Sequence, residues 1–190
     1  MIRKYEVEIK GITPLVWNRQ NMELREIIKK AKKDELDEIE KKYWLMKAEI
    51  NNGDVIIPSE WIGSNIYNSA KQTRLPPHFA TSKNQTYSNY ISNLKISPGK
   101  PIIVCKVKDL KRKEAMLASQ GKSPSGKKVL RCHPILEEWS IKFEIIDTVG
   151  RMKLDELKEL VSWGGMAVGI GDQRIFNFGR FEIIDIKELN

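Results

Sequence analysis

Residues 154–186 read LDELKELVSWGGMAVGIGDQRIFNFGRFEIIDI, and this stretch decides the fold. Its first part has apolar residues at helical spacing, namely Leu154, Leu157, Leu160 and Val161. Asp155 and Glu156 lie in the first turn, where acidic side chains suit the positive N-terminal end of a helix. Glycines then crowd the end of that helix, where they permit positive φ and close approach of another backbone. The last part is apolar and β-branched. The stretch therefore predicts a helix, a glycine-rich loop and a strand.

The glycine-rich loop, residues 164–180, is a candidate seat for phosphate. Uncovered backbone amides flanked by cationic side chains form an anion-binding concavity. The candidate residues are Gly169, Gly171, Arg174, Gly179 and Arg180. An equally open interpretation is that the glycines cap the helix and pack it against the sheet. The loop lacks the Lys-Ser/Thr end of a P-loop and follows a helix, so we expect no nucleotide cofactor.

Length and composition favour one domain, residues 1–190, that stays in the cytoplasm. The chain has 190 residues, 41% of them hydrophobic, and its apolar runs are far shorter than the ~20 residues of a membrane helix. The N-terminus lacks the apolar segment of a secretory signal. Cys105 and Cys132 are the only cysteines, too few for a cysteine cluster. We expect no metal and no cofactor.

The formal charge of +8 is concentrated in one segment. Residues 106–131 hold nine lysines and arginines against two acidic residues, a surplus of seven. Their centre, SQGKSPSGKK, is turn-forming, which predicts a basic, thumb-like hairpin or loop over residues 106–135. Concentrated positive charge on a projecting element suits a nucleic-acid backbone. The candidate binding residues are Lys111, Arg112, Lys113, Lys122, Lys127, Lys128 and Arg131.

The order of the remaining elements predicts an α+β fold. Residues 2–10 alternate apolar and charged side chains as a half-buried strand does, and residues 101–107 and 139–145 are two further strands. We expect a helical insertion at 21–50 with a solvated charged face and a long surface loop at 73–99. Without these additions the order is βαββαβ, the ferredoxin-like (RRM-like) core with a basic hairpin between the two middle strands.

Three segments together resemble the RAMP superfamily of CRISPR-associated proteins. They are the first strand running into ITPL, the segment GDVIIPSEWIGSNIYNSAK, which is similar to the family's "IPGSS-x-KG-x-x-R" segment, and the loop GIGDQRIFNFGRFEI. The resemblance implies an RNA-covering backbone subunit of an antiviral complex, with the basic segment as its thumb. Glu60 and Trp61 depart from the small residues of the family pattern, while Lys71 and Arg74 remain basic candidates at that helix end.

We therefore expect a non-catalytic protein that binds single-stranded nucleic acid, with RNA favoured over DNA, alone, as a homo-oligomer or within a ribonucleoprotein. Stacking on aromatic side chains would add affinity, and the candidates are Tyr87, Tyr90, Phe176 and Phe178. Residues 18–26 offer only Glu23 and Glu26, without the family's cleavage pattern. Two alternatives stay open. One is a metal-independent endoribonuclease that uses His78 or His133, and the other is a protein-interaction subunit.

Overall fold

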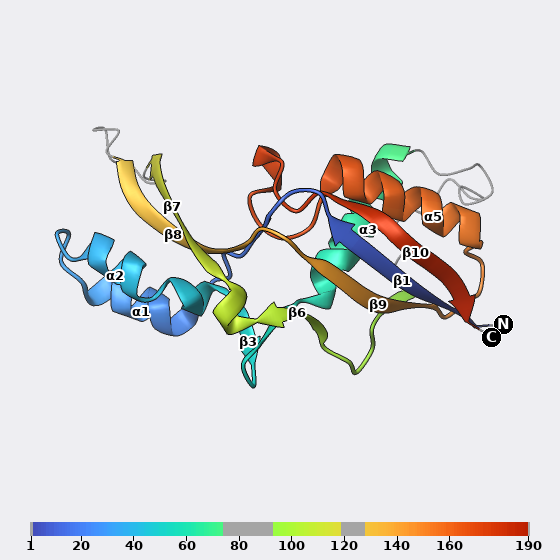
Figure 1. Ribbon diagram of the computed structural model, residues 1–190, viewed down its shortest axis with the longest axis horizontal. Coiled ribbons are helices and arrows are strands. Elements are labelled where there is room, and N and C mark those ends of the chain that lie inside the picture. Colours follow the sequence, from blue (N-terminus) through green and yellow to red (C-terminus); the bar gives the residue numbers. More distant parts are fainter. Residues whose placement is uncertain (1, 74–92, 119–127, 190) are drawn as a thin grey trace.

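The computed structural model describes residues 2–73, 93–118 and 128–189. It is an elongated α+β structure, with a sheet covered by two helices at one end and a long hairpin beside two further helices at the other (Figure 1). The α+β class predicted from the sequence is confirmed. In the part of the chain described, no helix is long and apolar enough to cross a membrane.

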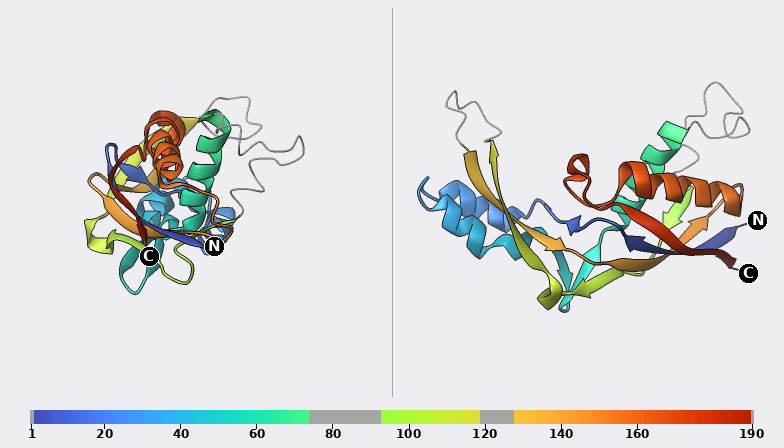
Figure 2. Two further views of the ribbon diagram at one scale, coloured as in Figure 1. Left: turned by 90° about the vertical axis from the view of Figure 1, so that its right-hand side faces the viewer. Right: turned by 45° about the horizontal axis from the view of Figure 1, so that its top comes forward.

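The main sheet has four antiparallel strands in the order β10-β1-β9-β5. Their bounds are Arg3–Gly11 for β1, Leu94–Ile96 for β5, Ser140–Asp147 for β9 and Phe181–Leu189 for β10. Two helices, α3 (Ser59–Thr73) and α5 (Leu154–Trp163), lie on the same side of this sheet (Figure 2). The predicted strand at 2–10 and the predicted helix, loop and strand at 154–186 are thus observed.

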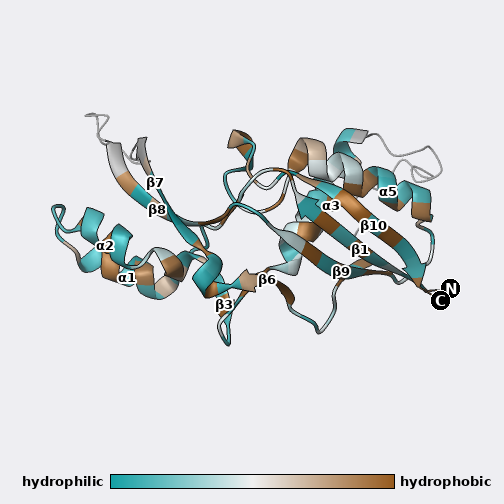
Figure 3. Cartoon of the chain, in the orientation of Figure 1, coloured by the Kyte–Doolittle hydropathy of each residue, from teal (hydrophilic) through white to brown (hydrophobic). Residues whose placement is uncertain are grey.

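The core lies between this sheet and its two helices. The apolar positions alternate along β1 and β9 and recur at helical spacing in α5, so they form one face of each element (Figure 3). They include the fully or almost fully buried Tyr5, Val7, Ile9, Ile141, Phe143, Ile145, Leu157 and Leu160. At the start of α5 the Glu156 carboxylate accepts the Lys153 amide at 2.9 Å, which satisfies one of the free N–H groups of that helix end.

One predicted strand belongs to a different sheet from the one expected. The strand expected at 101–107 is β6 (Ile102–Lys106), but it pairs with β4 (Asp54–Ile57) in a small sheet, β3-β4-β6, whose third strand is β3 (Glu49–Asn51). Its place in the main sheet is taken by β5, which lies within the segment expected to be an irregular loop. Three residues are too few to show an alternating pattern, and this explains the error.

The basic segment contains two paired strands. Strand β7 (Lys111–Ala118) pairs antiparallel with β8 (Lys128–Leu136), and β8 pairs in turn with β2 (Leu15–Val16). Beside this hairpin lies the segment 21–50, which contains α1 (Met22–Lys30), α2 (Leu36–Lys42) and the 3₁₀ turn η1 (Trp44–Lys47) (Figure 1). The side chain of Asn21 caps α1 by accepting the Leu24 amide at 3.0 Å.

A buried carboxylate joins the helices of this segment to the hairpin. Glu40 of α2 is 3% exposed and accepts hydrogen bonds from Lys47 Nζ at 2.5 Å, Arg131 Nη1 at 2.8 Å and the Cys132 amide at 3.0 Å. Burial acts to raise the pKa of Glu40, but these three donors outweigh it and the pKa is lowered. The expectation of a fully solvated charged face is therefore wrong at Glu40, because its charge holds two elements together.

We predict that Glu40→Ala destabilises the protein by about 3–5 kcal/mol, because among the described residues it leaves the buried Lys47 ammonium with only the Cys132 carbonyl as an acceptor. Urea unfolding followed by circular dichroism measures this loss. The matched control is Glu38→Ala in the same helix, where an exposed ion pair with Lys41 is removed and the midpoint should hardly move. Equal midpoints for the two variants would contradict the anchoring role of Glu40.

His133 of β8 makes stability depend on pH. It is 2% exposed, and neither ring nitrogen has a hydrogen-bond partner among the described residues. Burial first, and then the charge of Lys47, lower its pKa from 6.5 to about 4. The unfolded chain therefore binds a proton between about pH 6.5 and pH 4 that the folded chain does not bind, so stability falls as the pH is lowered through this window.

We predict that the free energy of unfolding of the wild type decreases by up to about 1.4 kcal/mol per pH unit in that window through His133 alone. Urea titrations at several pH values, repeated for His133→Leu, isolate this contribution as the difference in slope. The variant should show a flatter dependence below pH 6.5. The same slope for both proteins would show that His133 titrates normally in the folded state.

Candidate nucleic-acid interface

The glycine-rich loop has a tightly constrained backbone. It leaves α5 through a π-helical turn, η4 (Gly164–Val168), and contains the 3₁₀ turn η5 (Arg174–Phe176). Gln173 and Asn177, on either side of η5, adopt left-handed conformations with φ of 58° and 64°. Such conformations cost a non-glycine residue energy and concentrate at functional sites. The loop therefore presents η5 in one defined shape.

Two glycines let the loop pack against its surroundings. Gly179 has a φ of 69°, and a Cβ there would lie 1.8 Å from the Ile170 carbonyl oxygen. Its amide donates to the Pro14 carbonyl at 2.8 Å, and the Gly169 amide donates to the Gly164 carbonyl at 2.7 Å. These two amides are therefore already engaged within the protein. Neither of them is available to a phosphate, whereas the arginine side chains of the loop can bind one.

The hairpin meets the loop at Lys113. This residue of β7 donates from Nζ to Gln173 Oε1 at 3.1 Å, and its Nζ lies 3.6 Å from the centre of the Phe178 ring. Burial lowers the pKa of Lys113, because the ammonium is partly withdrawn from water. The basic segment and the glycine-rich loop, which are far apart in the sequence, are thus brought into contact.

Arg174 follows Gln173 in the chain, and Arg180 donates to the Arg174 carbonyl, so we group Lys113, Arg174 and Arg180 as the cationic cluster. Arg180 Nη2 lies 3.4 Å from both the Arg174 carbonyl and Asn177 Oδ1, and its Nη1 is buried with no partner among the described residues. Within the described ranges, no member of the cluster has a carboxylate within 4 Å. An anion would supply the missing acceptors.

The other predicted basic residues have partners or lie apart. On the hairpin, Lys111 pairs with Glu137 at 2.5 Å, Arg112 with Glu114 at 2.7 Å and Arg131 with Glu40. Lys71, at the end of α3, lies 4.2 Å from the centre of the Tyr67 ring. The remaining candidates fall outside the described residues or, for Lys128, have a side chain that is not described: Arg74, Lys122, Lys127, Lys128, His78, Tyr87 and Tyr90.

Exposed apolar side chains flank the cluster on η5. Phe176, a predicted stacking residue, is 63% exposed, whereas Phe178 is half-buried beneath Lys113. Ile175 is 86% exposed and was not predicted as a functional residue. An aromatic ring that projects beside unpaired cations suits a nucleic-acid strand, because phosphates and bases alternate along it.

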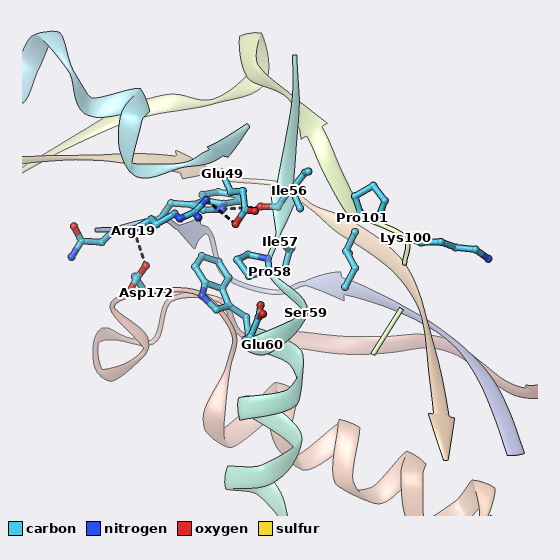
Figure 4. A pocket seen from close by; sticks show the side chains of 14 residues that line it. Arg19, Glu49, Ile56, Ile57, Pro58, Ser59, Glu60, Lys100, Pro101 and Asp172 are labelled. Atoms are coloured by element: carbon cyan, nitrogen blue, oxygen red, sulfur yellow. Dashed lines mark hydrogen bonds and ion pairs between the residues drawn. The ribbon is translucent and has the colours of Figure 1, made fainter. Parts of the chain in front are cut away.

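A pocket of about 580 Å³ lies beside Asp172, which precedes Gln173 in the glycine-rich loop. Figure 4 shows Asp172 on one side of it and Lys100 and Pro101 on the other. The Asn18 amide donates to Asp172 Oδ2 at 2.7 Å, and burial raises the pKa of this carboxyl. No part of this pocket was predicted from the sequence. Among the described residues, no three His, Cys, Asp or Glu side chains are placed to hold a metal ion.

Comparison with solved structures finds a related fold. A chain of the type III-B Cmr-beta complex bound to cognate target RNA, solved by cryo-electron microscopy, superposes with a TM-score of 0.56 at 12% sequence identity. The match covers 100% of this chain and 61% of that chain, so this protein spans about three-fifths of the length of the chain it matches. No protein-family model matches the sequence, and no curated protein matches it either. At this identity the likeness shows a common fold.

Proposed function

We propose that the protein is a non-catalytic subunit that binds single-stranded RNA within a CRISPR-type ribonucleoprotein. The observation that carries this proposal is the cationic cluster, where two separately predicted basic elements meet and hold three cations, none of which has a described carboxylate within 4 Å. Such charges sit poorly in a half-buried environment unless an anion joins them. The choice of RNA rests on the family resemblance and on the fold shared with the Cmr-beta chain.

We further propose that the main sheet is a ferredoxin-like core of the RAMP type. The chain order β1, α3, β5, β9, α5, β10 supports this, as does the sheet order, which puts the first strand between the third and the fourth. Both helices lie on one side of the sheet (Figure 2). On this interpretation the segment 21–50 and the β7–β8 hairpin are additions to the core, and the hairpin corresponds to the family's thumb.

In this proposal the single-stranded RNA passes over the cationic cluster and η5. Lys113, Arg174 and Arg180 bind successive phosphates, and Phe176 stacks on a base that is turned toward the protein. Lys111 and Arg112 add weaker attraction farther along the hairpin, since each already has an acidic neighbour. Binding of this kind is electrostatic and largely independent of sequence.

The buried state of His133 argues against the nuclease alternative. A general acid or base must come within hydrogen-bond reach of the substrate, and His133 is 2% exposed with its pKa lowered to about 4. We therefore assign His133 to the hairpin's core. The alternative then depends on His78, which lies outside the described residues.

We predict that neutralising the cluster, by Lys113→Gln, Arg174→Gln and Arg180→Gln together, weakens binding to labelled single-stranded RNA and makes it less dependent on salt. Each phosphate contact that is lost reduces the slope of log affinity against log salt by about 0.7 for a single strand, so the triple variant should lose about 2. Fluorescence anisotropy at several salt concentrations measures both quantities.

The matched control is the pair Lys142→Gln and Lys187→Gln, two exposed lysines that both pair with Glu6 on the main sheet. This variant changes the net charge without touching the cluster, so its salt slope should stay close to that of the wild type. Thermal melting of each variant separates lost binding from lost folding. A triple variant that is folded and keeps the wild-type slope would remove the cluster from the binding site.

We predict that the purified protein leaves single-stranded RNA intact, with or without a chelator, because the described structure offers no exposed histidine to act as acid or base. Denaturing gels after long incubation test this. Cleavage that persists with the chelator and disappears in His78→Ala would instead establish the endoribonuclease.

A further inference from the structure

We propose that the pocket beside Asp172 receives one unstacked base of the bound strand and selects guanine. This inference rests on the proposed function, because it assumes that a nucleic-acid strand crosses the adjacent cationic cluster. Asp172 and Arg174 are two residues apart in the same constrained loop, so a strand whose phosphates lie on the cluster has a base within reach of the pocket. Its volume of about 580 Å³ lies within the ~300–1,000 Å³ of small-ligand sites.

The charges of the pocket exclude phosphate as its ligand. Its two cations are already paired, Arg19 with Glu49 at 3.0 Å and Lys100 with Glu144 at 2.7 Å. Asp172 and Glu60 also line it, and neither has a described cation within 4 Å. The charged groups of the pocket that lack a described ion-pair partner are therefore both carboxylates. They repel a phosphate and attract a neutral ligand that presents N–H donors.

One of the residues that line the pocket, Trp61, suits a flat ring. Trp61, in the first turn of α3, is half-buried, and its ring centre lies 6.1 Å from that of Trp17 at an interplanar angle of 41°. Trp17 is fully buried, and its indole Nε1 lies 3.4 Å from the Ile56 carbonyl, so it supports Trp61 from the protein side. The partly exposed indole of Trp61 is left as a platform on which a base stacks.

Gly171 brings the carboxylate of Asp172 to this platform. Its φ is 79°, and a Cβ there would lie 2.7 Å from Leu15 Cδ1 and 3.2 Å from Trp61 Cζ3, so only glycine lets the loop pass this close. The Asp172 amide donates to the Val16 carbonyl at 2.9 Å, and the Asn18 amide holds Oδ2. Oδ1 accepts no hydrogen bond from a described residue, and Oδ2 keeps a second lone pair.

Two adjacent acceptors on a fixed carboxylate match guanine better than the other bases. Guanine presents N1–H and N2–H₂ side by side on its Watson–Crick edge, whereas adenine and cytosine each present a ring nitrogen acceptor beside their amino group. Uracil presents a single N–H between two carbonyls. A carboxylate that faces any of these three meets at least one acceptor and is repelled. Unstacked bases are commonly read through this edge.

The test compares oligouridine strands that carry one central guanine, one central adenine or neither. We expect the wild type to bind the guanine strand at least about fivefold more tightly than the other two, the lower limit for one good bidentate pair. Asp172→Asn keeps an oxygen for the Asn18 amide but replaces one acceptor with a donor, so it should abolish the preference for the guanine strand. Asp185→Asn, an exposed carboxylate on β10, is the matched control and should keep the preference.

Trp61→Ala should weaken binding of the guanine and adenine strands alike, while Trp61→Phe should restore most of it.

Equal affinity of the wild type for all three strands would overturn the guanine pocket and leave the proposed function standing. If no strand binds, the proposed function fails. Quenching of tryptophan fluorescence by guanosine and not by adenosine would then still uphold the pocket. Stronger quenching by arginine amide than by guanosine would overturn it, because the pocket would then suit a partner protein's arginine.

Discussion

The position of the hairpin depends on the buried carboxylate of Glu40. A charge that is 3% exposed is tolerated only when donors surround it, and the donors here come from η1 and from β8. Separating the helices of the segment 21–50 from the hairpin would therefore remove the hydrogen bonds that Glu40 accepts from Arg131 and the Cys132 amide, and the one that Lys47 donates to the Cys132 carbonyl. Because β7 is paired with β8 along its length, the same carboxylate sets where Lys113 lies.

The glycine-rich loop is held to the hairpin through β2 and the turn before it. Pro14 accepts the Gly179 amide, Val16 accepts the Asp172 amide, and Val16 is itself paired with Ile135 of β8. Two residues of one short strand region thus connect the loop to the hairpin. This connection explains how segments 60 residues apart in the sequence form one surface, and why the pocket lies beside that surface.

The parts of the fold that the sequence predicts are those with long repeating patterns. The alternation of Tyr5, Val7 and Ile9 identifies β1, and the spacing of the leucines identifies α5, because each pattern spans several turns or pleats. Strand β5 has three residues and shows no pattern, and its place was wrongly given to β6. Local patterns say which face of an element is buried, but they do not say which strand it joins.

The candidate site was predictable only in part, for a related reason. Its basic residues are visible in the sequence, but whether each one has a carboxylate nearby depends on contacts such as that of Arg131 with Glu40, across 91 residues. The pocket was missed because its lining comes from the segments around Trp17, Trp61 and Asp172, and no pattern in the sequence shows that these three segments meet.

The number of basic residues in a segment and the absence of acidic partners thus indicate different binding surfaces. The surplus of seven positive charges in residues 106–131 draws attention to the whole hairpin, yet Lys111, Arg112 and Arg131 all have acidic neighbours. The unpaired charges lie at its base, where Lys113 meets the loop. An exposed pair is easily exchanged for a phosphate and so adds long-range attraction, whereas a partly buried cation without a partner favours an anion at one defined place. The hairpin would then attract the RNA strand, and the glycine-rich loop would determine where that strand binds.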